Sequence, residues 1–366
     1  MIAIVSSSHF PDDERIYHKQ IHSLLDVGKN ITYYTRSISS INLSKRRLIH
    51  INYDQKISIK KFTHNVAIEI LNHKLIDQVQ IHETELLPLL KIIKQKRKHT
   101  YSVYDIHEDM EAMYRTFSKR SFFVRELAII KRNYDEKKNL KFVDQIILAN
   151  KPVNKSRYAK LKIKKVVVEN FVEINALSLK SNYNKKPYII YHGHLGPERG
   201  VEDLVIAMNT VVKRYLKVRL TLLGTFRTYD FEIKILKLIK DLTLGDHIKI
   251  IKQVPYKDVW KILRESSIGV IPFRKNPLTE NCTPTKLFEM MASSHQIVST
   301  SLPPVQSFVN NSIHWAESDN PHSLANAITS SIESLNDNSK IEENINLIKS
   351  KYNWDIIKNR YTSLFK

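Results

Sequence analysis

The chain has 366 residues, more than a single hydrophobic core usually organises, so we expect two domains. Its 42% hydrophobic and 26% charged residues are typical of a globular protein, and the lack of a long apolar run argues against a membrane-spanning segment. The single cysteine, Cys282, excludes disulfides within the chain and cysteine-based metal sites, and it fits a reducing cytoplasm. The first residues are apolar without a basic start, which is typical of a strand and not of a signal peptide.

The charge is strongly positive, because 58 Lys and Arg residues against 37 Asp and Glu residues give a net +21. Three kinds of anionic partner would account for it, namely nucleic acid, an anionic membrane face or small polyanionic substrates. Lysine is abundant along the whole chain, so part of the charge can also be a compositional bias with no partner behind it.

In the first half, short apolar strands alternate with amphipathic helices. One predicted helix covers Glu14–Val27 and ends at Gly28, and another covers Glu85–Lys96. The predicted strands cover Ile2–Ser6, Ile31–Thr35, Val79–Ile81, Ser102–Asp105, Gln145–Leu148 and Lys165–Val168. This alternation is typical of a parallel sheet covered by helices.

A polar stretch, residues 178–186, interrupts the alternation and is the predicted linker. Further strands are predicted over Tyr188–Tyr191, Val218–Leu223, His247–Ile251, Ile268–Pro272, Gln296–Ser299 and Ile313–Trp315. Helices are predicted between them over Arg199–Tyr215, Phe231–Leu242, Tyr256–Glu265, Lys286–Ala292 and Pro321–Leu335. We therefore predict two doubly wound α/β domains, residues 1–177 and 187–345, that face a central cleft and bind ligands at the carboxyl ends of their strands.

The helix that starts at Pro284 has the features of an anion site. Thr283 is its predicted N-cap and Pro284 its first residue. The backbone amides left free to bind phosphate would be those of Thr285, Lys286 and Leu287. Glu289 lies on the same face as Lys286, so a cation for phosphate and a carboxylate for sugar hydroxyls would be adjacent. A surface Lys–Glu pair on an ordinary helix explains the same residues.

A glycine-containing turn, His192–Gly200, follows the first strand of the second domain. Gly193 and Gly196 would let the backbone approach a ligand closely, and Arg199 would begin the next helix near the positive end of its dipole. A plain tight turn is the alternative. If both segments serve a ligand, the doubly wound order would bring this turn and the Pro284 helix to one crevice.

Histidines follow two strands of the first domain. His107 comes after Ser102–Asp105, and His82 comes one strand earlier, so both are expected at carboxyl ends where they could hold a sugar or move a proton. Arg15 lies in the first turn of a helix that Asp12 or Asp13 would cap, and its charge opposes the helix dipole unless it has an acceptor. Purely structural hydrogen bonds are the alternative for these side chains.

Aromatic residues and cations interleave from Arg115 to Arg125 and continue to Lys131 and Arg132. This pattern is typical of a helix that lies at a membrane interface. A solvated basic face with its apolar side on the core is the alternative.

Several motifs are missing. There is no Asp-x-Asp, so a metal-held diphosphate is not expected, and no Gly-x-x-x-x-Gly-Lys-Ser/Thr loop, which disfavours ATP hydrolysis. The Gly-x-Ser-x-Gly motif of serine hydrolases and the Gly-x-Gly-x-x-Gly dinucleotide fingerprint are missing too.

Six short motifs, in the right order, resemble those of the family-four retaining glycosyltransferases, in particular a bacterial branch that builds cell-surface polysaccharide. They are residues 6–16, 81–88, 104–109, 166–171, 284–292 and 352–355. The resemblance implies the GT-B fold, with residues 346–366 packing back on the first domain. It also implies transfer from a nucleotide-diphosphate sugar with retention of configuration and without a metal or other cofactor.

The resemblance also assigns donor-side residues. Glu289 matches the family glutamate that binds the ribose hydroxyls, and Arg199 takes the place of the lysine that binds the diphosphate. His194 stands where many members have an arginine, a loss for which Lys286 would compensate. The family motif contains two glutamates, and Glu289 matches the second of them. The position of the first falls near Glu280 or Asn281, and strict spacing selects Asn281.

The remaining assignments concern the base, the sugar and the acceptor. Backbone atoms near Val254 would read the base, and His107 resembles the histidine that contacts the transferred sugar. Arg15, His82 and Glu108 are the expected acceptor-side residues. His295 stands where a glycine is usual, which predicts a different loop after that helix.

The predicted function is thus transfer of a sugar, from a UDP-sugar by preference, to a saccharide, lipid-linked or polymer acceptor in the cytoplasm, at the inner face of the membrane. An epimerase or hydrolase of nucleotide sugars with the same fold is the alternative among enzymes. A basic nucleic-acid-binding protein is the alternative outside enzymes, although no recognised nucleic-acid module is present and the cations form no single stripe.

Overall fold

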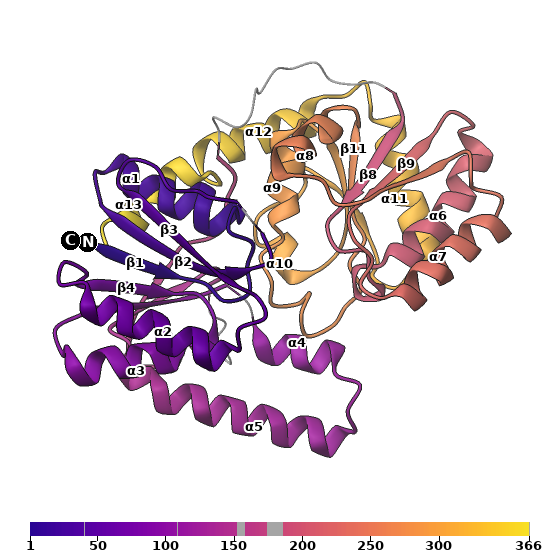
Figure 1. The fold of residues 1–366 in the computed structure, drawn as a ribbon. Coiled ribbons are helices and arrows are strands. Elements are labelled where there is room, and N and C mark those ends of the chain that lie inside the picture. Colours follow the sequence, from indigo (N-terminus) through magenta and orange to yellow (C-terminus); the bar gives the residue numbers. More distant parts are fainter. Residues whose placement is uncertain (40, 108, 152–157, 174–185, 366) are drawn as a thin grey trace. The chain divides into compact units, whose positions relative to one another are not determined.

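The computed structural model describes residues 1–39, 41–107, 109–151, 158–173 and 186–365. They form two compact units, unit 1 with Met1–Asn170 and Ile357–Lys366, and unit 2 with Phe171–Ile356 (Figure 1). The predicted linker, 178–186, lies outside the described residues except for its last one. Within the described ranges, no helix has the length and apolar character needed to cross a membrane.

Unit 1 is built on a sheet of seven parallel strands in the order β3-β2-β1-β4-β5-β6-β7. The strands are β1 Ile2–Val5, β2 Ile31–Ser37, β3 Leu48–Asp54, β4 Gln78–Ile81, β5 Tyr101–Ile106, β6 Gln145–Leu148 and β7 Lys164–Val167. Strand β1 pairs with β2 on one side and with β4 on the other, so the direction of winding reverses there. The carboxyl ends of β1 and β4 therefore form a topological switch point, the usual ligand position in such sheets.

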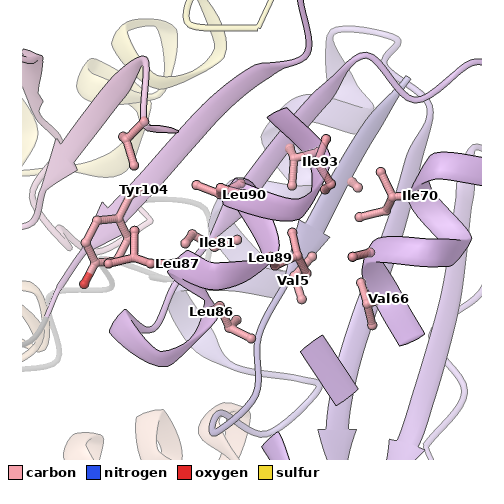
Figure 2. Close-up of a cluster of buried hydrophobic side chains, with 14 of the residues drawn as sticks. Val5, Val66, Ile70, Ile81, Leu86, Leu87, Leu89, Leu90, Ile93 and Tyr104 are labelled. Atoms are coloured by element: carbon pink, nitrogen blue, oxygen red, sulfur yellow. The ribbon is translucent and has the colours of Figure 1, made fainter. Parts of the chain in front are cut away.

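The helices of unit 1 cover its sheet. They are η1 Glu14–Ile21, α1 His22–Asp26, α2 Ile59–Asn72, η2 Thr84–Leu86, α3 Leu87–Lys96, α4 Met110–Phe117, α5 Phe122–Asn139 and η3 Leu140–Phe142. Helix α2 starts where the Ser58 hydroxyl accepts the Lys61 amide, and it buries Phe62, Val66 and Ile70 at helical spacing. Figure 2 shows Val66 and Ile70 with side chains of α3 and the strands in one apolar cluster.

Unit 2 repeats the plan with six parallel strands in the order β10-β9-β8-β11-β12-β13, so its switch point lies between β8 and β11. Its strands are β8 Tyr188–His192, β9 Arg219–Leu223, β10 Ile248–Ile251, β11 Ile268–Ile271, β12 Gln296–Thr300 and β13 His314–Ala316. Its helices are η5 Pro197–Arg199, α6 Val201–Arg214, α7 Tyr229–Asp241, α8 Tyr256–Arg264, α9 Thr285–Ala292, α10 Pro303–Gln306, α11 Pro321–Glu333 and α12 Ser339–Ser350.

Within the last helix, α13 Trp354–Thr362, the chain passes from unit 2, which ends at Ile356, to unit 1, which resumes at Ile357. Its Tyr361 is buried in unit 1 and donates a hydrogen bond of 2.9 Å to the side-chain oxygen of Gln80. The closing residues from Ile357 onward therefore complete the fold of unit 1.

The predicted fold class, two parallel α/β domains, is confirmed. Every strand expected from the sequence is present with its ends within two residues of the prediction. Strand β3 was not predicted. It is the edge strand beside β2, and its polar residues at alternate positions, His50 and Asn52, hide the apolar run that marks the other strands.

The helix expected over Glu14–Val27 is two elements. A π-helix, Glu14–Ile21, leads into the short α1, and Gly28, with φ +82°, ends the segment as predicted. Asp13 is the cap, accepting the amides of Arg15 and Ile16. The wide π-helical turn places residues five apart on one side, which is how Arg15 and Gln20 reach the same partner.

Buried histidines should make the fold sensitive to acid. Burial lowers the pKa of His82, His295 and His314 to about 4, so these rings are neutral in the folded chain at pH 7. A depressed pKa gives stability that is complete above the unfolded value near 6.5 and is lost as the pH falls toward 4. Between pH 7 and pH 5 we expect a loss of about 1 kcal/mol or more per histidine, measured by urea unfolding. An unfolding free energy equal at both pH values would contradict this.

Candidate functional site

The candidate site of unit 2 lies at the carboxyl end of β8. The chain leaves the strand at His192 and turns at Gly193, which has φ +108° and donates its amide to the Leu223 carbonyl at 2.9 Å. A Cβ on Gly193 would lie 2.8 Å from the Lys286 ammonium, so glycine is needed for this lysine to sit against the turn. The Lys286 ammonium thus lies directly beside Gly193, and the close approach of a ligand to this glycine remains a prediction.

Three cations gather around this turn. The Lys286 ammonium lies 4.9 Å from the ring centre of Phe273 and 5.0 Å from that of Tyr191, and the Arg199 guanidinium carbon lies 4.6 Å from the Phe273 ring. Arg227, which follows β9, donates to Glu198 at 2.9 Å. Aromatic faces and one carboxylate thus hold fixed positive groups at the switch point.

Burial and the neighbouring cations shift the pKa values of side chains in this cluster. Burial, followed by the charge of Arg199, lowers the pKa of Lys286 from 10.5 to about 7. Burial also lowers the pKa of His194, with Arg227, Lys286 and Arg199 adding to the effect. Crowded cations favour a bound anion, because the anion would stabilise the charged form of Lys286.

Glu289 faces the same end of the sheet from α9. It is buried, and its Oε2 lies 3.5 Å from Nε2 of His192, the last residue of β8. Burial, with Lys286 contributing, holds the pKa of His192 well below its usual value, so the ring is neutral. A carboxylate therefore lies in the same switch-point region as the cations, as the sequence predicted from Lys286 and Glu289.

The start of α9 differs from the prediction. The cap position is Pro284 and not Thr283, and no side chain caps this helix. The amides of Thr285 and Leu287 donate to the carbonyls of Thr283 and Pro284, at 3.0 and 2.8 Å, so these two are not free to bind an anion. The positive groups here therefore come mainly from side chains.

Other predicted donor residues lie in loops at the carboxyl ends of the strands. Gly196 and His194 lie in the turn after β8, where the His194 carbonyl accepts from the Tyr191 hydroxyl at 2.7 Å, and Val254 follows β10. Glu280 and Asn281 lie between β11 and α9, each with a local partner: Glu280 lies 3.6 Å from the Lys275 ammonium, and Asn281 donates to the Pro277 carbonyl at 2.9 Å.

From the family resemblance, His295 was expected at the position where a glycine is usual. In the structure, the backbone conformation that favours glycine occurs one residue earlier. The left-handed backbone position after α9, with φ +60°, belongs to Ser294. His295 is fully buried, and its two ring nitrogens face the carbonyls of Met290 and Leu263 at 3.2 and 2.9 Å. It ties the carboxyl ends of α8 and α9 together, so its role is structural.

In unit 1 the corresponding switch point holds a carboxylate in a serine-rich turn. Glu83, just after β4, accepts hydrogen bonds from the Ser6 hydroxyl and from the amides of Ser7 and Ser8, at 2.6 to 3.1 Å. Although burial opposes it, His9 at 2.8 Å, with His82 and the Ser6 hydroxyl, lowers the pKa of Glu83 to about 2. Nε2 of His9 then lies 2.9 Å from Nε2 of His107. The predicted sugar-contacting histidine is thus positioned by a Glu–His pair.

Arg15 has a buried partner. Its Nε and Nη2 donate to the two oxygens of Asp105 at 3.0 and 2.9 Å, and Gln20 donates to the same carboxylate at 2.6 Å. Although burial opposes it, Arg15 holds the pKa of Asp105 well below its usual range. This pair accounts for the charge of Arg15 inside the first helix turn. The acceptor-side role of Arg15 remains a prediction.

His82 lies beside the same carboxylate. It is buried, with Nδ1 3.5 Å from Asp105, and its potential ligand atoms and those of Asp105 and His107 lie within 4.8 Å of one another. A metal ion there would have to displace the hydrogen bonds from Arg15 and Gln20 and meet the guanidinium charge. Glu108, the remaining predicted acceptor-side residue, lies outside the described residues.

The prediction from sequence missed several residues. Arg227 and Phe273 could have been found, because each follows a strand of unit 2 at its carboxyl end. His9 and Glu83 were not recognised because their role depends on β1 and β4 being neighbours, a pairing between segments more than 70 residues apart.

Comparison with known proteins agrees with this picture. Residues 177–347 match the family described as "Glycosyl transferases group 1". Over 99% of this chain and 98% of the other, the fold is similar to that of HepE from Anabaena in complex with UDP and glucose, with a TM-score of 0.75 and 12% identity. Sucrose-phosphate synthase from Thermosynechococcus elongatus gives a TM-score of 0.72 at 15% identity, covering 100% of this chain and 98% of its own.

A third similar structure is a trehalose-6-phosphate synthase studied for the mechanism of glycosyl transfer with retention. Its TM-score is 0.72 at 13% identity, over 99% of this chain and 98% of that one. No curated protein sequence matches the chain significantly. The fold is therefore GT-B, and the family match together with the fold supports a glycosyltransferase.

Proposed function

We propose that the protein transfers a sugar from a nucleotide-diphosphate sugar, preferably a UDP-sugar, to a saccharide, lipid-linked or polymer acceptor in cell-surface glycan synthesis, with retention of configuration. The observation that carries the proposal is the cluster of Arg199, Arg227 and Lys286 at the β8 switch point. Such fixed cations would stabilise the charge that grows on the leaving diphosphate, which is the main catalytic requirement of this transfer.

Within unit 2, each group has a proposed role. Arg199 and Lys286 bind the diphosphate, and Glu289 binds the ribose hydroxyls. Gly193 and Gly196 let the phosphates approach the backbone, and the segment from Glu280 to Leu287 completes the donor site. Backbone atoms at Val254, after β10, read the base. These roles agree with the positions of all these residues at or beyond the carboxyl ends of the strands.

The proposed role of unit 1 is to bind the sugar and the acceptor. His107 would contact the transferred sugar, held in place by His9 and Glu83. Burial, followed by His9, lowers the pKa of His107 to about 4, so its ring is neutral near pH 7 and can accept or donate a hydrogen bond to a hydroxyl. Arg15 and His82 would act on the acceptor side through the Asp105 network.

The proposed reaction needs no metal, because side-chain cations take the role of a divalent ion at the diphosphate. It would take place in the cytoplasm at the inner face of the cell membrane, where a lipid-linked acceptor is available. The net charge of +21 fits contact with an anionic membrane.

A screen of UDP-, GDP- and ADP-sugars for thermal stabilisation tests the proposal, followed by product analysis with a lipid-diphosphate saccharide in the presence of EDTA. We expect one donor class to raise the melting temperature and to be consumed with retention of the anomeric configuration. An epimer formed from donor alone would support the epimerase alternative. A requirement for magnesium would contradict the metal-free mechanism.

Lys286 should make donor binding depend on pH. Its pKa of about 7 in the free protein means that the ammonium is lost as the pH rises through neutrality, whereas a bound diphosphate favours the charged form. We expect the Kd of UDP, measured by calorimetry, to rise between pH 6.5 and pH 8.5, by up to about tenfold per pH unit. Lys286→Arg, which stays charged, should remove this dependence, and an unchanged slope in that variant would contradict the assignment.

A further inference from the structure

We infer that the exposed apolar face of α5 docks the protein on the surface of an anionic lipid bilayer. The proposed function supplies only the reason for such docking, a lipid-linked acceptor, and the surface itself rests on separate observations in unit 1. Helix α5 spans Phe122–Asn139 and lies next to α3 at the edge of this unit (Figure 1).

Four large apolar side chains form a stripe along α5. They are spaced four, three and four residues apart, which places them on one side of a helix, and they are Phe123, Leu127, Ile130 and Tyr134. Their exposed fractions are 78, 66, 64 and 66%. The residues that α5 buries, Ile129 and Glu136, lie seven apart on the other side of the helix. The stripe therefore faces away from the core of unit 1.

The charges beside the stripe are almost all positive. Among residues 119–138, every one of which the structure describes, the exposed cations are Lys119, Arg120, Lys131, Lys137 and Lys138. Asp135 is the exposed acid of this segment. The other two acids are less exposed: Glu126 is half-buried and pairs with Arg115 at 2.5 Å, and Glu136 is buried against the Tyr158 hydroxyl at 3.1 Å.

This charge pattern indicates which partner binds the exposed stripe of α5. A second copy of the chain would bring the same cations of α5 against each other, and like charges repel across an interface. An anionic bilayer attracts them, while the stripe enters the boundary between headgroups and acyl chains, where Phe and Tyr side chains are favoured. Charge complementarity and the apolar stripe therefore point to the same partner.

Helix α7 of unit 2 offers a comparison within the same chain. It also exposes residues at helical spacing, Tyr229, Ile233 and Leu236, but the latter two are only 48 and 49% exposed. Acids accompany its lysines, since Asp230 and Asp241 are exposed and Lys234 pairs with Glu202 at 2.7 Å. Helix α7 therefore provides matched control positions for α5.

Vesicle flotation tests the inference with the full chain. We compare vesicles of phosphatidylcholine with vesicles of an equal mixture of phosphatidylcholine and phosphatidylglycerol. The wild type should float with the anionic vesicles only, and raised salt should weaken the binding. Leu127→Asn with Ile130→Asn should lower the partition coefficient roughly tenfold or more. Lys131→Glu with Lys138→Glu should lower it about a hundredfold.

The controls carry the same substitutions on α7, Ile233→Asn with Leu236→Asn and Lys237→Glu with Lys240→Glu, and should float like the wild type. Light scattering in solution measures the oligomeric state. The inference would be overturned if the wild type did not bind the vesicles, or if substitutions in α5 and α7 lowered vesicle binding equally. It would also be overturned if the wild type were a dimer that the α5 substitutions dissociate.

The vesicle measurement needs neither donor nor acceptor. A chain that floats through α5 yet transfers no sugar keeps the membrane surface and loses the proposed function. A chain that transfers sugar to a water-soluble acceptor but never floats keeps the proposed function and loses the membrane surface.

Discussion

Replacing Arg199 by alanine is expected to lower kcat/KM for the preferred donor by about a hundredfold to a thousandfold, because it removes one of the cations that we propose stabilise the leaving diphosphate. Arg199 lies over Phe273 beside Lys286, so its removal takes one positive charge out of this cluster. Glu289→Gln should give a comparable loss by weakening the proposed hydrogen bonds from the ribose hydroxyls to this carboxylate. The glutamine keeps the side-chain volume at a position that is only 6% exposed.

The control for this experiment is Arg219→Ala. Arg219 starts β9, so it lies at the amino end of the same sheet and its loss should leave turnover within about twofold of the wild type. Melting temperature and the affinity for UDP separate misfolding from lost catalysis. Near-normal turnover in both Arg199→Ala and Glu289→Gln would mean that the donor site lies elsewhere.

The sheet could be predicted from sequence because strands of a parallel sheet are covered on both faces and carry continuous apolar runs. The strand β11, Ile268–Ile271, is fully buried and was located almost to the residue. The edge strand β3 lacks that signal, since it pairs with a strand on one side only and several of its side chains are exposed to solvent. Helix caps are set by one or two hydrogen bonds, which is why the start of α9 was predicted one residue early.

The site was predictable as far as a single rule applies, namely that ligands lie beyond the carboxyl ends of parallel strands. The residues predicted with that rule, Arg199, Lys286 and Glu289 in unit 2 and the histidines in unit 1, do lie at these ends, and their roles remain predictions. The rule does not reveal partners. Asp105 meets Arg15, which lies 90 residues earlier, because β5 lies beside β4 and β4 beside β1. A single sequence gives the strands but not their order in the sheet, so such pairs remain hidden.

The Arg15–Asp105 pair gives the largest expected effect on stability. Arg15→Met removes the charge but keeps an apolar side chain of similar length, and it leaves a fully buried carboxylate that still accepts a hydrogen bond from Gln20 but has lost its guanidinium partner. We expect the free energy of unfolding at pH 7 to fall by about 3 to 5 kcal/mol, measured by urea denaturation. In comparison, Arg214→Met breaks an exposed pair with Glu333, whose side chains are 63 and 50% exposed, and should cost less than about 1 kcal/mol.

A second substitution, Asp105→Asn, tests whether the lost stability comes from the unpaired Asp105 carboxylate. In the wild type, Arg15 keeps the Asp105 pKa low, so the pair stabilises the fold above the ordinary carboxyl pKa and loses that effect in acid. Without Arg15, burial raises the pKa of Asp105, and the deficit of Arg15→Met should therefore shrink as the pH falls from 7 to 5. Adding Asp105→Asn to Arg15→Met should recover much of the lost stability at pH 7, because the unpaired charge is gone. If the double variant is as unstable as the sum of the single variants, the loss comes from packing and not from a stranded carboxylate.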